Sequence, residues 1–204
     1  MKFLLTVAVL FLLVATGFYL IDLVQGPLAV SVPVAAATST FTDPGVFSFE
    51  YLTDSALSEK ANAETQDWKQ GSTTFGMLLA TVTIGDDFEP KTNFRDAKFT
   101  VGTSTATSSV ASCLTEGSGE ASSTPTTING TTFSKIMFSD AGAGNFYETT
   151  SYRTLKGVEC YAVEYTIHST NIGNYSPDQG ITEFDKVKVQ GVLEATVQSF
   201  KLLK

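Results

Sequence analysis

The stretch from about Tyr152 to Phe200 shows the clearest alternation of hydrophobic and polar positions in the chain. Within residues 160–168 the odd positions are large and apolar, whereas the even positions begin small and end polar. Because side chains alternate between the faces of a strand, this pattern predicts a strand with two unlike faces. The main core is expected on the face that carries Tyr161, Val163, Tyr165 and Ile167. A second covering layer is expected over the near end of the other face, which carries Cys160, Ala162, Glu164, Thr166 and His168.

The pattern between residues 181 and 200 predicts an amphipathic helix that closes the fold. Its apolar positions recur at steps of three and one residues, which places them on a single stripe of a helix. The stripe consists of Val189, Val192, Leu193, Thr196, Val197 and Phe200. We predict that this stripe packs on one face of the sheet. The opposite side is expected to face solvent, and it carries Gln190, Glu194 and Gln198.

Shorter patterns upstream predict the rest of one α+β domain with an antiparallel sheet. The dipeptide Asn129-Gly130 is expected to form a two-residue type I′ turn, because both central positions of that turn need positive φ. A short helix is expected to begin near Ser108 or Ser109 and to end before Gly117. Strands are expected over residues 46–52, 74–84, 98–101 and 131–139, loops over residues 117–127 and 140–145, and a helical turn over residues 58–64.

Residues 3–21 form a long apolar run at the N-terminus. As a helix the run spans roughly 28 Å, about the thickness of a bilayer core. Lys2 is the positive charge before the run, and the next Lys or Arg is Lys60. This asymmetry predicts a single-pass protein of the cell membrane, with a cytoplasmic N-terminus and an extracytoplasmic domain.

The sequence Ala35-Ala36-Ala37 offers an alternative, in which the protein is secreted after cleavage near Ala37. We favour the uncleaved anchor, because the apolar run is longer than that of a usual signal peptide. The expected organisation is a signal-anchor or transmembrane segment at residues 1–22, a linker rich in Ala, Val, Ser, Thr and Pro at residues 23–42, and an extracytoplasmic domain at residues 43–204.

The charge of the chain narrows the range of partners. There are 13 Lys and Arg residues against 21 Asp and Glu residues, which gives a formal net charge of −8. A nucleic-acid partner is not expected, because phosphate binding needs a basic surface. The apolar content of 43% and the charged content of 17% are typical of a globular domain.

Several short motifs, in their order along the chain, resemble the PsbP-like fold. The motifs are Phe47-Ser48-Phe49-Glu50-Tyr51, Ile128-Asn129-Gly130, the strand Cys160 to Ile167 and the helix end Val197-Gln198-Ser199-Phe200. Thr92-Asn93-Phe94, YRT at Tyr152, HSTN at His168 and EFD at Glu183 are similar to motifs of uncharacterised membrane-tethered bacterial proteins of this type. The resemblance covers roughly residues 45–203. It implies an antiparallel sheet sandwiched between helices and a function in binding, and it transfers no active-site residue.

Cys113 and Cys160 are the two cysteines of the chain. Such a pair tends to oxidise outside the cytoplasm. Cys160 falls on the small face of its predicted strand, and Cys113 falls on a short helix that could cover that face. We therefore predict a disulfide, with two unrelated buried thiols as the alternative.

His168 is the single histidine and the leading candidate for catalytic chemistry. As a general base it would be oriented by Asp185 or Glu164 and would activate Ser169, with Arg153 on the neighbouring strand. Adjacent strand residues point to opposite faces, however, so His168 and Ser169 should not meet. The interpretation we favour is structural, with His168 hydrogen-bonded to loop backbone where the strand ends.

These observations leave two classes of function. The favoured class is a membrane-tethered extracytoplasmic domain that binds a protein or another envelope component without catalysis. The alternative is a small extracytoplasmic hydrolase that uses His168, with Arg153 and Asp185 as weak further candidates. No cofactor is expected, and no metal site is expected, because two cysteines and one histidine lack ligand spacing.

Overall fold

The structure is a computed structural model that describes residues 37–59, 64–115 and 123–203. The predicted membrane segment at residues 3–21 and the predicted linker up to residue 36 lie outside these ranges. Within the described ranges, no helix is both long and apolar enough to cross a bilayer. The folded domain begins at Ala37.

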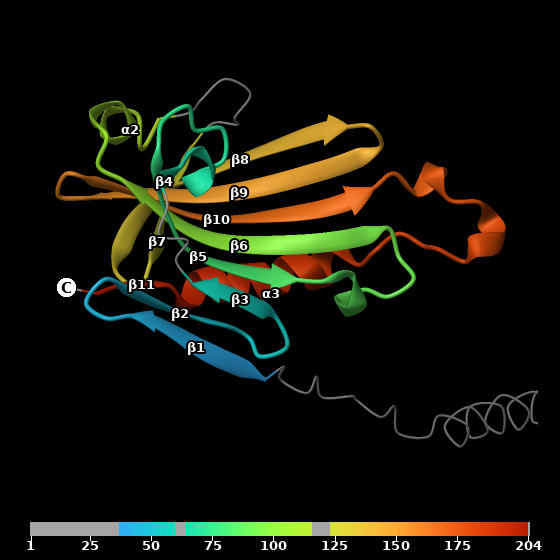
Figure 1. The fold of residues 1–204 in the computed structure, drawn as a ribbon. Helices are drawn as coiled ribbons and strands as arrows, with labels where there is room; N and C mark the ends of the chain where they lie inside the picture. The colour runs from blue at the N-terminus through green and yellow to red at the C-terminus, as the bar shows by residue number, and fades with distance from the viewer. Residues whose placement is uncertain (1–36, 60–63, 116–122, 204) are drawn as a thin grey trace, which may run out of the picture. The chain divides into compact units, whose positions relative to one another are not determined.

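Long antiparallel strands form the centre of the domain (Figure 1). In the described residues the order across this main sheet is β3-β5-β6-β10-β9-β8-β7, and β4 pairs with β5. Strands β8, β9 and β10 each run for 12 residues. The predicted antiparallel sheet is therefore confirmed. The strands are β3 (Ala56–Glu59), β4 (Glu64–Thr65), β5 (Gly76–Ile84), β6 (Phe94–Ser104), β7 (Thr124–Ile128), β8 (Thr131–Gly142), β9 (Asn145–Lys156) and β10 (Glu159–Thr170).

Helix α3 (Lys186–Ser199) packs on the face of the main sheet that carries the large apolar side chains of β10. Val189 and Leu193 of the helix are buried in one cluster with Val163 and Tyr165 of the strand. The side chain of Asp185 begins the helix by accepting the backbone N–H of the third helical residue at 3.0 Å, which is an N-cap. The predicted stripe of the closing helix is confirmed at these buried positions.

A small second sheet lies beside α3 and completes this layer (Figure 1). Its aromatic side chains connect it to the main sheet, because the Phe49 ring lies 5.2 Å from Phe41 and 4.8 Å from Phe99 between centroids. The first strand of this sheet lies in the predicted linker, so the folded domain begins earlier than expected. Apart from Phe41 this strand is made of polar residues, which gave no apolar pattern in the sequence. The strands are β1 (Thr38–Asp43), β2 (Phe47–Leu52) and β11 (Lys201–Leu202).

The other face of the main sheet is covered at its near end by α2 (Thr107–Ala111) and by the 3₁₀ turn η1 (Gln66–Trp68). The Trp68 side chain is fully buried and lies directly over Gly76, and the Trp68 backbone lies over Gly102. A Cβ on Gly102 would lie 1.9 Å from the carbonyl oxygen of Trp68, and a Cβ on Gly76 would lie 2.5 Å from its ring. The missing side chains therefore provide the space for this second, smaller core.

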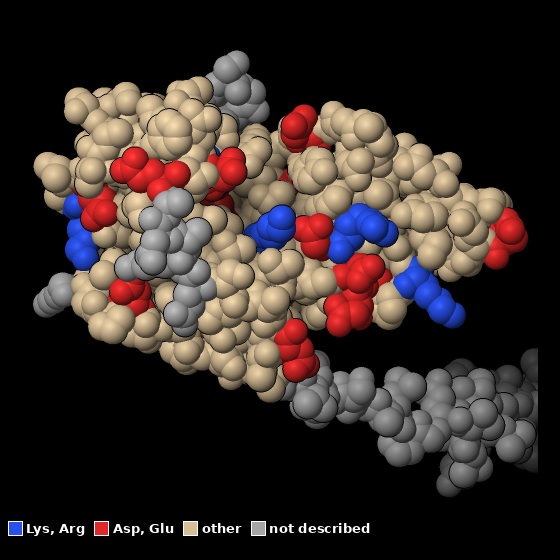
Figure 2. Space-filling view, in the orientation of Figure 1, with Lys and Arg blue, Asp and Glu red and all other residues tan. Residues whose placement is uncertain are grey.

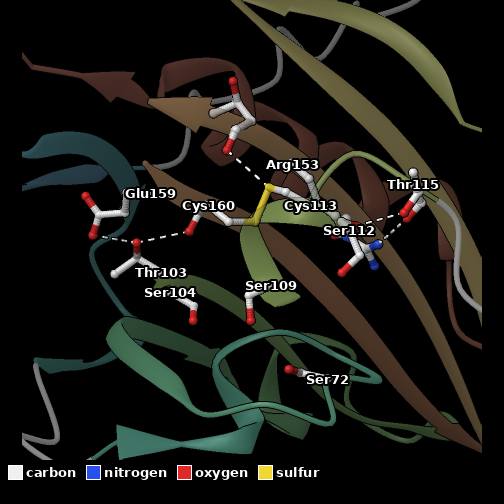
Figure 3. The surroundings of a disulfide bond; sticks show 12 residues. Ser72, Thr103, Ser104, Ser109, Ser112, Cys113, Thr115, Arg153, Glu159 and Cys160 are labelled. Carbon is white, nitrogen blue, oxygen red and sulfur yellow. Dashed lines mark hydrogen bonds between the residues drawn. A yellow bond between two sulfur atoms is a disulfide. The ribbon is translucent and has the colours of Figure 1, made fainter. Parts of the chain in front are cut away.

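Cys113 and Cys160 join α2 to β10 through a disulfide with an S–S distance of 2.04 Å. Figure 3 shows the bond with Arg153 and Thr115 on one side and Thr103 and Glu159 on the other. Both cysteines pack with Trp68 in the smaller core. The predicted pairing and the predicted covering of the small face of β10 are confirmed.

The β7–β8 turn is the predicted type I′ turn, because Asn129 and Gly130 have φ values of 47° and 83°. The Asn129 amide also donates to the carbonyl oxygens of Gln198 and Phe200, each at 2.8 Å. Carbonyl groups at a helix end lack partners within the helix, so this side chain caps the C-terminal end of α3.

Several elements differ in extent from the prediction. Residues 124–127, expected in a loop, belong to β7, and residues 140–142, also expected in a loop, belong to β8. Residues 58–59, where a helical turn was expected, belong to β3. Pairing with a neighbouring strand holds these weakly apolar segments extended, and a single sequence does not show that contact.

Leu193→Ala is expected to lower the free energy of unfolding by about 2–5 kcal/mol, since the side chain is 1% exposed in the main core. Gln198→Ala on the exposed side of α3 should change it by less than about 0.5 kcal/mol. Chemical denaturation of both variants measures the two values. Equal effects would show that α3 does not dock through this stripe.

The cysteines are expected to resist alkylation in the native protein until a reductant is added. Replacing both by alanine should cost about 4 kcal/mol, because the two positions are 47 residues apart and the cross-link restricts the unfolded chain. Mass spectrometry after alkylation, with and without reductant, and denaturation of the double variant provide the measurements. Free alkylation of the untreated native protein would contradict the pairing.

Candidate functional site

A groove of about 640 Å³ opens between α3 and strands β8, β9 and β10. Its strand side is mixed, because the apolar Met137, Tyr165 and Ile167 share one face of the sheet with polar residues. The polar residues of that face are Ser139, Glu148 and Thr150. Its helix side is polar and is formed by Lys186 and Gln190. The groove therefore offers hydrophobic contact and hydrogen-bonding groups at the same place.

An ion pair between Glu148 and Lys186 lies at the lip of this groove, with Nζ 2.5 Å from Oε2. The side chains are 48% and 52% exposed, so solvent screens the pair and its contribution to stability is only about 0–1 kcal/mol. Its effect is mainly positional, because it ties the first turn of α3 to β9. Met137 on the strand side is 51% exposed, so its apolar surface is accessible to a partner.

A polar cluster centred on Glu194 of α3 adjoins the groove through Tyr165. The Tyr152 hydroxyl donates to the Glu194 carboxylate at 2.8 Å, and the Tyr165 hydroxyl donates at 2.9 Å. The Lys135 ammonium group lies 3.0 Å from the same carboxylate. The prediction that Glu194 faces solvent is therefore wrong. Two strand tyrosines and a lysine reach the flank of the helix, and their positions depend on the pairing of β8, β9 and β10.

The surroundings of the cluster fix its protonation. Burial alone would raise the pKa of Glu194, but hydrogen bonds from Tyr152, Lys135 and Tyr165 together outweigh burial, and that pKa is lowered. Burial and the adjacent carboxylate raise the pKa of Tyr152, and burial is the main cause that raises the pKa of Tyr165 to about 12. At neutral pH Glu194 is therefore ionised and both tyrosines are protonated. Their hydrogen bonds hold the three side chains in one arrangement.

His168 lies on the opposite face of the sheet from the groove, near the end of β10. Its Nδ1 is 2.9 Å from Oδ2 of Asp96, and its Nε2 is 2.9 Å from Oδ1 of Asn145. The Asn145 amide nitrogen faces carbonyl groups of the β8–β9 turn, which leaves its oxygen toward the histidine. Tyr147 stacks on the imidazole at 4.4 Å between centroids. His168 thus connects β6 to the β8–β9 hairpin through side chains, where backbone acceptors were expected.

Arg153 and Glu164 belong to a buried polar chain beneath α2. The Arg153 Nε donates to the Ser151 hydroxyl at 2.9 Å, and that hydroxyl donates to Glu164 at 2.6 Å. The other Glu164 oxygen accepts the backbone N–H of Gln70 at 2.8 Å. Burial raises the pKa of Glu164, although these hydrogen bonds and the charge of Arg153 oppose the shift. These hydrogen bonds anchor the segment around Gln70, which covers this face, to the sheet.

The structure does not bring the three catalytic candidates into one site. Arg153 pairs with Ala162, six positions along β10 from His168, so the two side chains attach roughly 20 Å apart. Asp185 caps α3, which packs on the other face of the sheet. Glu164, the other proposed partner of His168, is bonded to Ser151 and Gln70.

The sequence contained one signal for the cluster that was missed. Tyr165 was placed correctly on the core face, but a phenol in a core needs a hydrogen-bond partner. Among the helix residues predicted to lie nearby, Glu194 was the acceptor with sufficient reach. Its pairing with Tyr165 could have been inferred, whereas that of Lys135 depended on an unpredicted register.

Comparisons with known proteins give little further information. No family model and no curated protein match the chain. One crystal structure from Bacteroides thetaiotaomicron VPI-5482, at 1.50 Å resolution, is similar with a TM-score of 0.38 and 14% sequence identity. The match covers 81% of this chain and 48% of that one, so the chain spans about half the length of its structural neighbour. A similarity at this level carries no argument about function.

Glu194→Gln is expected to lower the free energy of unfolding at neutral pH by roughly 1–3 kcal/mol, because hydrogen bonds to a charged acceptor are lost. The folded state lowers the pKa of Glu194 below 4.5. Its contribution is therefore present above that value and is lost as the pH falls through the folded-state pKa. Chemical denaturation across the acid range should show the two proteins converging. The control is Glu183→Gln at an exposed position, and a wild-type difference that stays constant into acid would contradict the assignment.

Proposed function

We propose that the protein is a membrane-tethered, extracytoplasmic binding domain of the cell envelope, and that its partner binds in the groove between α3 and β8–β10. The observation that carries the proposal is the groove itself. Its volume of about 640 Å³ lies in the range of ligand-binding clefts. Apolar side chains from the strands lie in it beside polar side chains from the strands and the helix, as in sites that combine affinity with orientation.

The groups in and beside the groove support binding over catalysis. Tyr165 holds its proton at neutral pH and Glu194 is fully engaged by its donors. They keep the groove wall in one geometry, which lowers the entropic cost of association. His168, on which the alternative hydrolase depends, lies on the opposite face with both ring nitrogens at acceptors. Binding to a protein or another envelope component is therefore the function that we favour.

The surface charges favour a partner recognised by shape and apolar contact. Figure 2 shows the face of the sheet opposite α3, where Lys and Arg are interspersed with Asp and Glu. The ion pair between Glu148 and Lys186 leaves the groove without an excess of either sign. A mixed, weakly charged surface gives little long-range steering of a strongly charged ligand.

The proposed location follows from the sequence at the N-terminus. Residues 3–21 would anchor the protein, and Lys2 would remain in the cytoplasm. The disulfide between Cys113 and Cys160 supports an extracytoplasmic domain, because such bonds persist in oxidising compartments. Release after cleavage near Ala37 would keep the same compartment.

We also propose that the domain is a PsbP-like α/β/α sandwich. The supporting arrangement is the main sheet with α3 on one face and α2 on the other. Helix α2 has five residues, so the second helical layer is partial and is completed by η1.

Site-specific cross-linking in intact cells tests the binding proposal. A photoreactive phenylalanine analogue at Met137, in the full-length protein, should capture a discrete partner. The matched control is the same analogue at Val158, which is 77% exposed in the β9–β10 turn and outside the groove. Capture that is absent at Met137, or equal at both positions, would count against the groove.

A reporter that is active only outside the cytoplasm, fused after Lys204, should be active, and the intact protein should fractionate with membranes. Both results follow from the charge asymmetry around residues 3–21. Activity of a cytoplasmic reporter at the same position would reverse the orientation. A soluble mature chain that begins near Ala37 would replace the anchor by secretion.

A further inference from the structure

We infer that the partner of the groove is an extended peptide segment that adds a strand to the free edge of β8, with alternate side chains in the groove. This inference deepens the proposed function and rests on it. The edge in question runs from Met137 to Ala141.

The pairing of β8 leaves this edge open in the described part of the chain. Strand β7 pairs with β8 only as far as Lys135, whereas β9 pairs with it from Ser134 to Gly142. Beyond Lys135 the described residues therefore supply no neighbour on the β7 side. In Figure 1 β8 forms the upper rim of the sheet, and no described element runs along its second half.

The turns at both ends of β8 determine which backbone groups point outward. Residues that flank a two-residue turn exchange both backbone hydrogen bonds, and the direction then alternates along the strand. Thr131 and Gly142 flank the two turns of β8, so the backbone N–H and C=O groups of Thr131 point to β7 and those of Gly142 point to β9. Counting every second residue from either end assigns the same residues to the open edge. The N–H and C=O groups of Met137, Ser139 and Ala141 point to the open edge.

One side-chain contact agrees with this assignment and removes one of the outward N–H groups from those free to bind a partner. The Ala141 N–H donates to its neighbour, the Asp140 carboxylate, at 2.8 Å, so it does not bond to β9. The remaining outward donors are the N–H groups of Met137 and Ser139, and the outward acceptors are the carbonyl groups of Met137, Ser139 and Ala141. Among the described residues none of these groups has a hydrogen-bond partner.

The spacing of these groups selects the chemistry of the occupant. Alternate residues of a strand are about 6.8 Å apart, and only another extended chain presents donors and acceptors at that repeat. A helix cannot replace it, because its own N–H and C=O groups are bonded internally. The occupant is therefore an extended segment, which binds by β-augmentation.

The groove supplies the side-chain component of the contact. Met137 and Ser139 point to the face of the sheet that carries the groove, and both line it. An added strand would present every second side chain to this same face. Met137 would be the cross-strand neighbour of one of those side chains and favours an apolar group there, and the net charge of −8 disfavours an acidic segment.

Other edges of the main sheet are protected in ways that this one is not. Strands β3 and β4 have four and two residues, and β7 carries Pro125. Short strands and prolines are common means of blocking unwanted strand addition. The segment Ile136–Gly142 contains no proline and no lysine, and its one charge, Asp140, points away from the groove.

Random heptapeptides displayed on phage provide the probe, with the full-length protein in nanodiscs as the target. We expect recovered peptides to alternate apolar and polar residues. Their binding should slow amide hydrogen exchange at Met137 and Ser139, which should exchange rapidly in the free protein. Protection in the free protein would show that this chain or a second copy already covers the edge, and would overturn the inference, as would failure to recover any binder.

A matched pair of variants then measures how much the backbone hydrogen bond of residue 139 contributes to peptide binding. Ser139→Pro removes one outward N–H and none of the bonds to β9, and it should weaken binding by at least about tenfold. Ser139→Ala keeps the N–H and should stay within about threefold of the wild type. If Ser139→Pro lowers the melting temperature strongly, N-methylation of alternate amides in a recovered peptide replaces it. That change removes the backbone donors of the peptide and leaves the protein unaltered. Equal binding by both variants, or by both peptide forms, would overturn the inference.

These outcomes separate the inference from the function on which it rests. Cross-linking from Met137 together with equal binding by the Ser139 variants would retain the groove as a binding site and reject strand addition. Failure of the cross-linking as well would reject both.

Discussion

The two unlike faces of β10 determine what the other elements of the domain can do. Val163 and Tyr165 need a deep layer of apolar partners, and α3 with the small second sheet provides it. On the other face, Cys160, Ala162 and the neighbouring Gly102 have small side chains or none. The thin layer above them is therefore filled by the Trp68 residue and the short helix α2. Since side chains alternate along the regular part of β10, neither layer could shift by one residue without exchanging large and small side chains.

The groove is a result of the unequal lengths of the layers. Strands β8 and β9 run for 12 residues, and α3 packs mainly against β10, β6, β7 and β2. The far parts of β8 and β9 therefore extend past the helix with one face uncovered, and Met137 remains half exposed there. The Glu194 cluster closes the inner end with groups that are already satisfied. A recess of this kind requires no strained residue, only a sheet that is wider than its cover.

The features that could be predicted from the sequence are those fixed by neighbouring residues. The faces of β10, the type I′ turn at Asn129 and the small residues around Cys160 depend on alternation or on local backbone preference, and they were found. Strand β7 and the end of β8 were missed, because their Thr, Pro, Ala and Gly residues become extended only through pairing. Glu194 was misplaced for a similar reason, since its partners come from strands whose register was unknown. Of the residues that line the groove, Tyr165, Ile167 and Gln190 were singled out in advance, and Gln190 was placed on the solvent side.

The side chain of Asn129 gives the β7–β8 hairpin a second effect on the domain. Its amide donates to two carbonyl groups at the end of α3, 69 and 71 positions away along the chain. The hairpin and the helix therefore cannot open independently without leaving those carbonyl groups unsatisfied. The consequence is cooperative: the helix end gains its protection against fraying from a turn in another element, and both should belong to one unfolding unit.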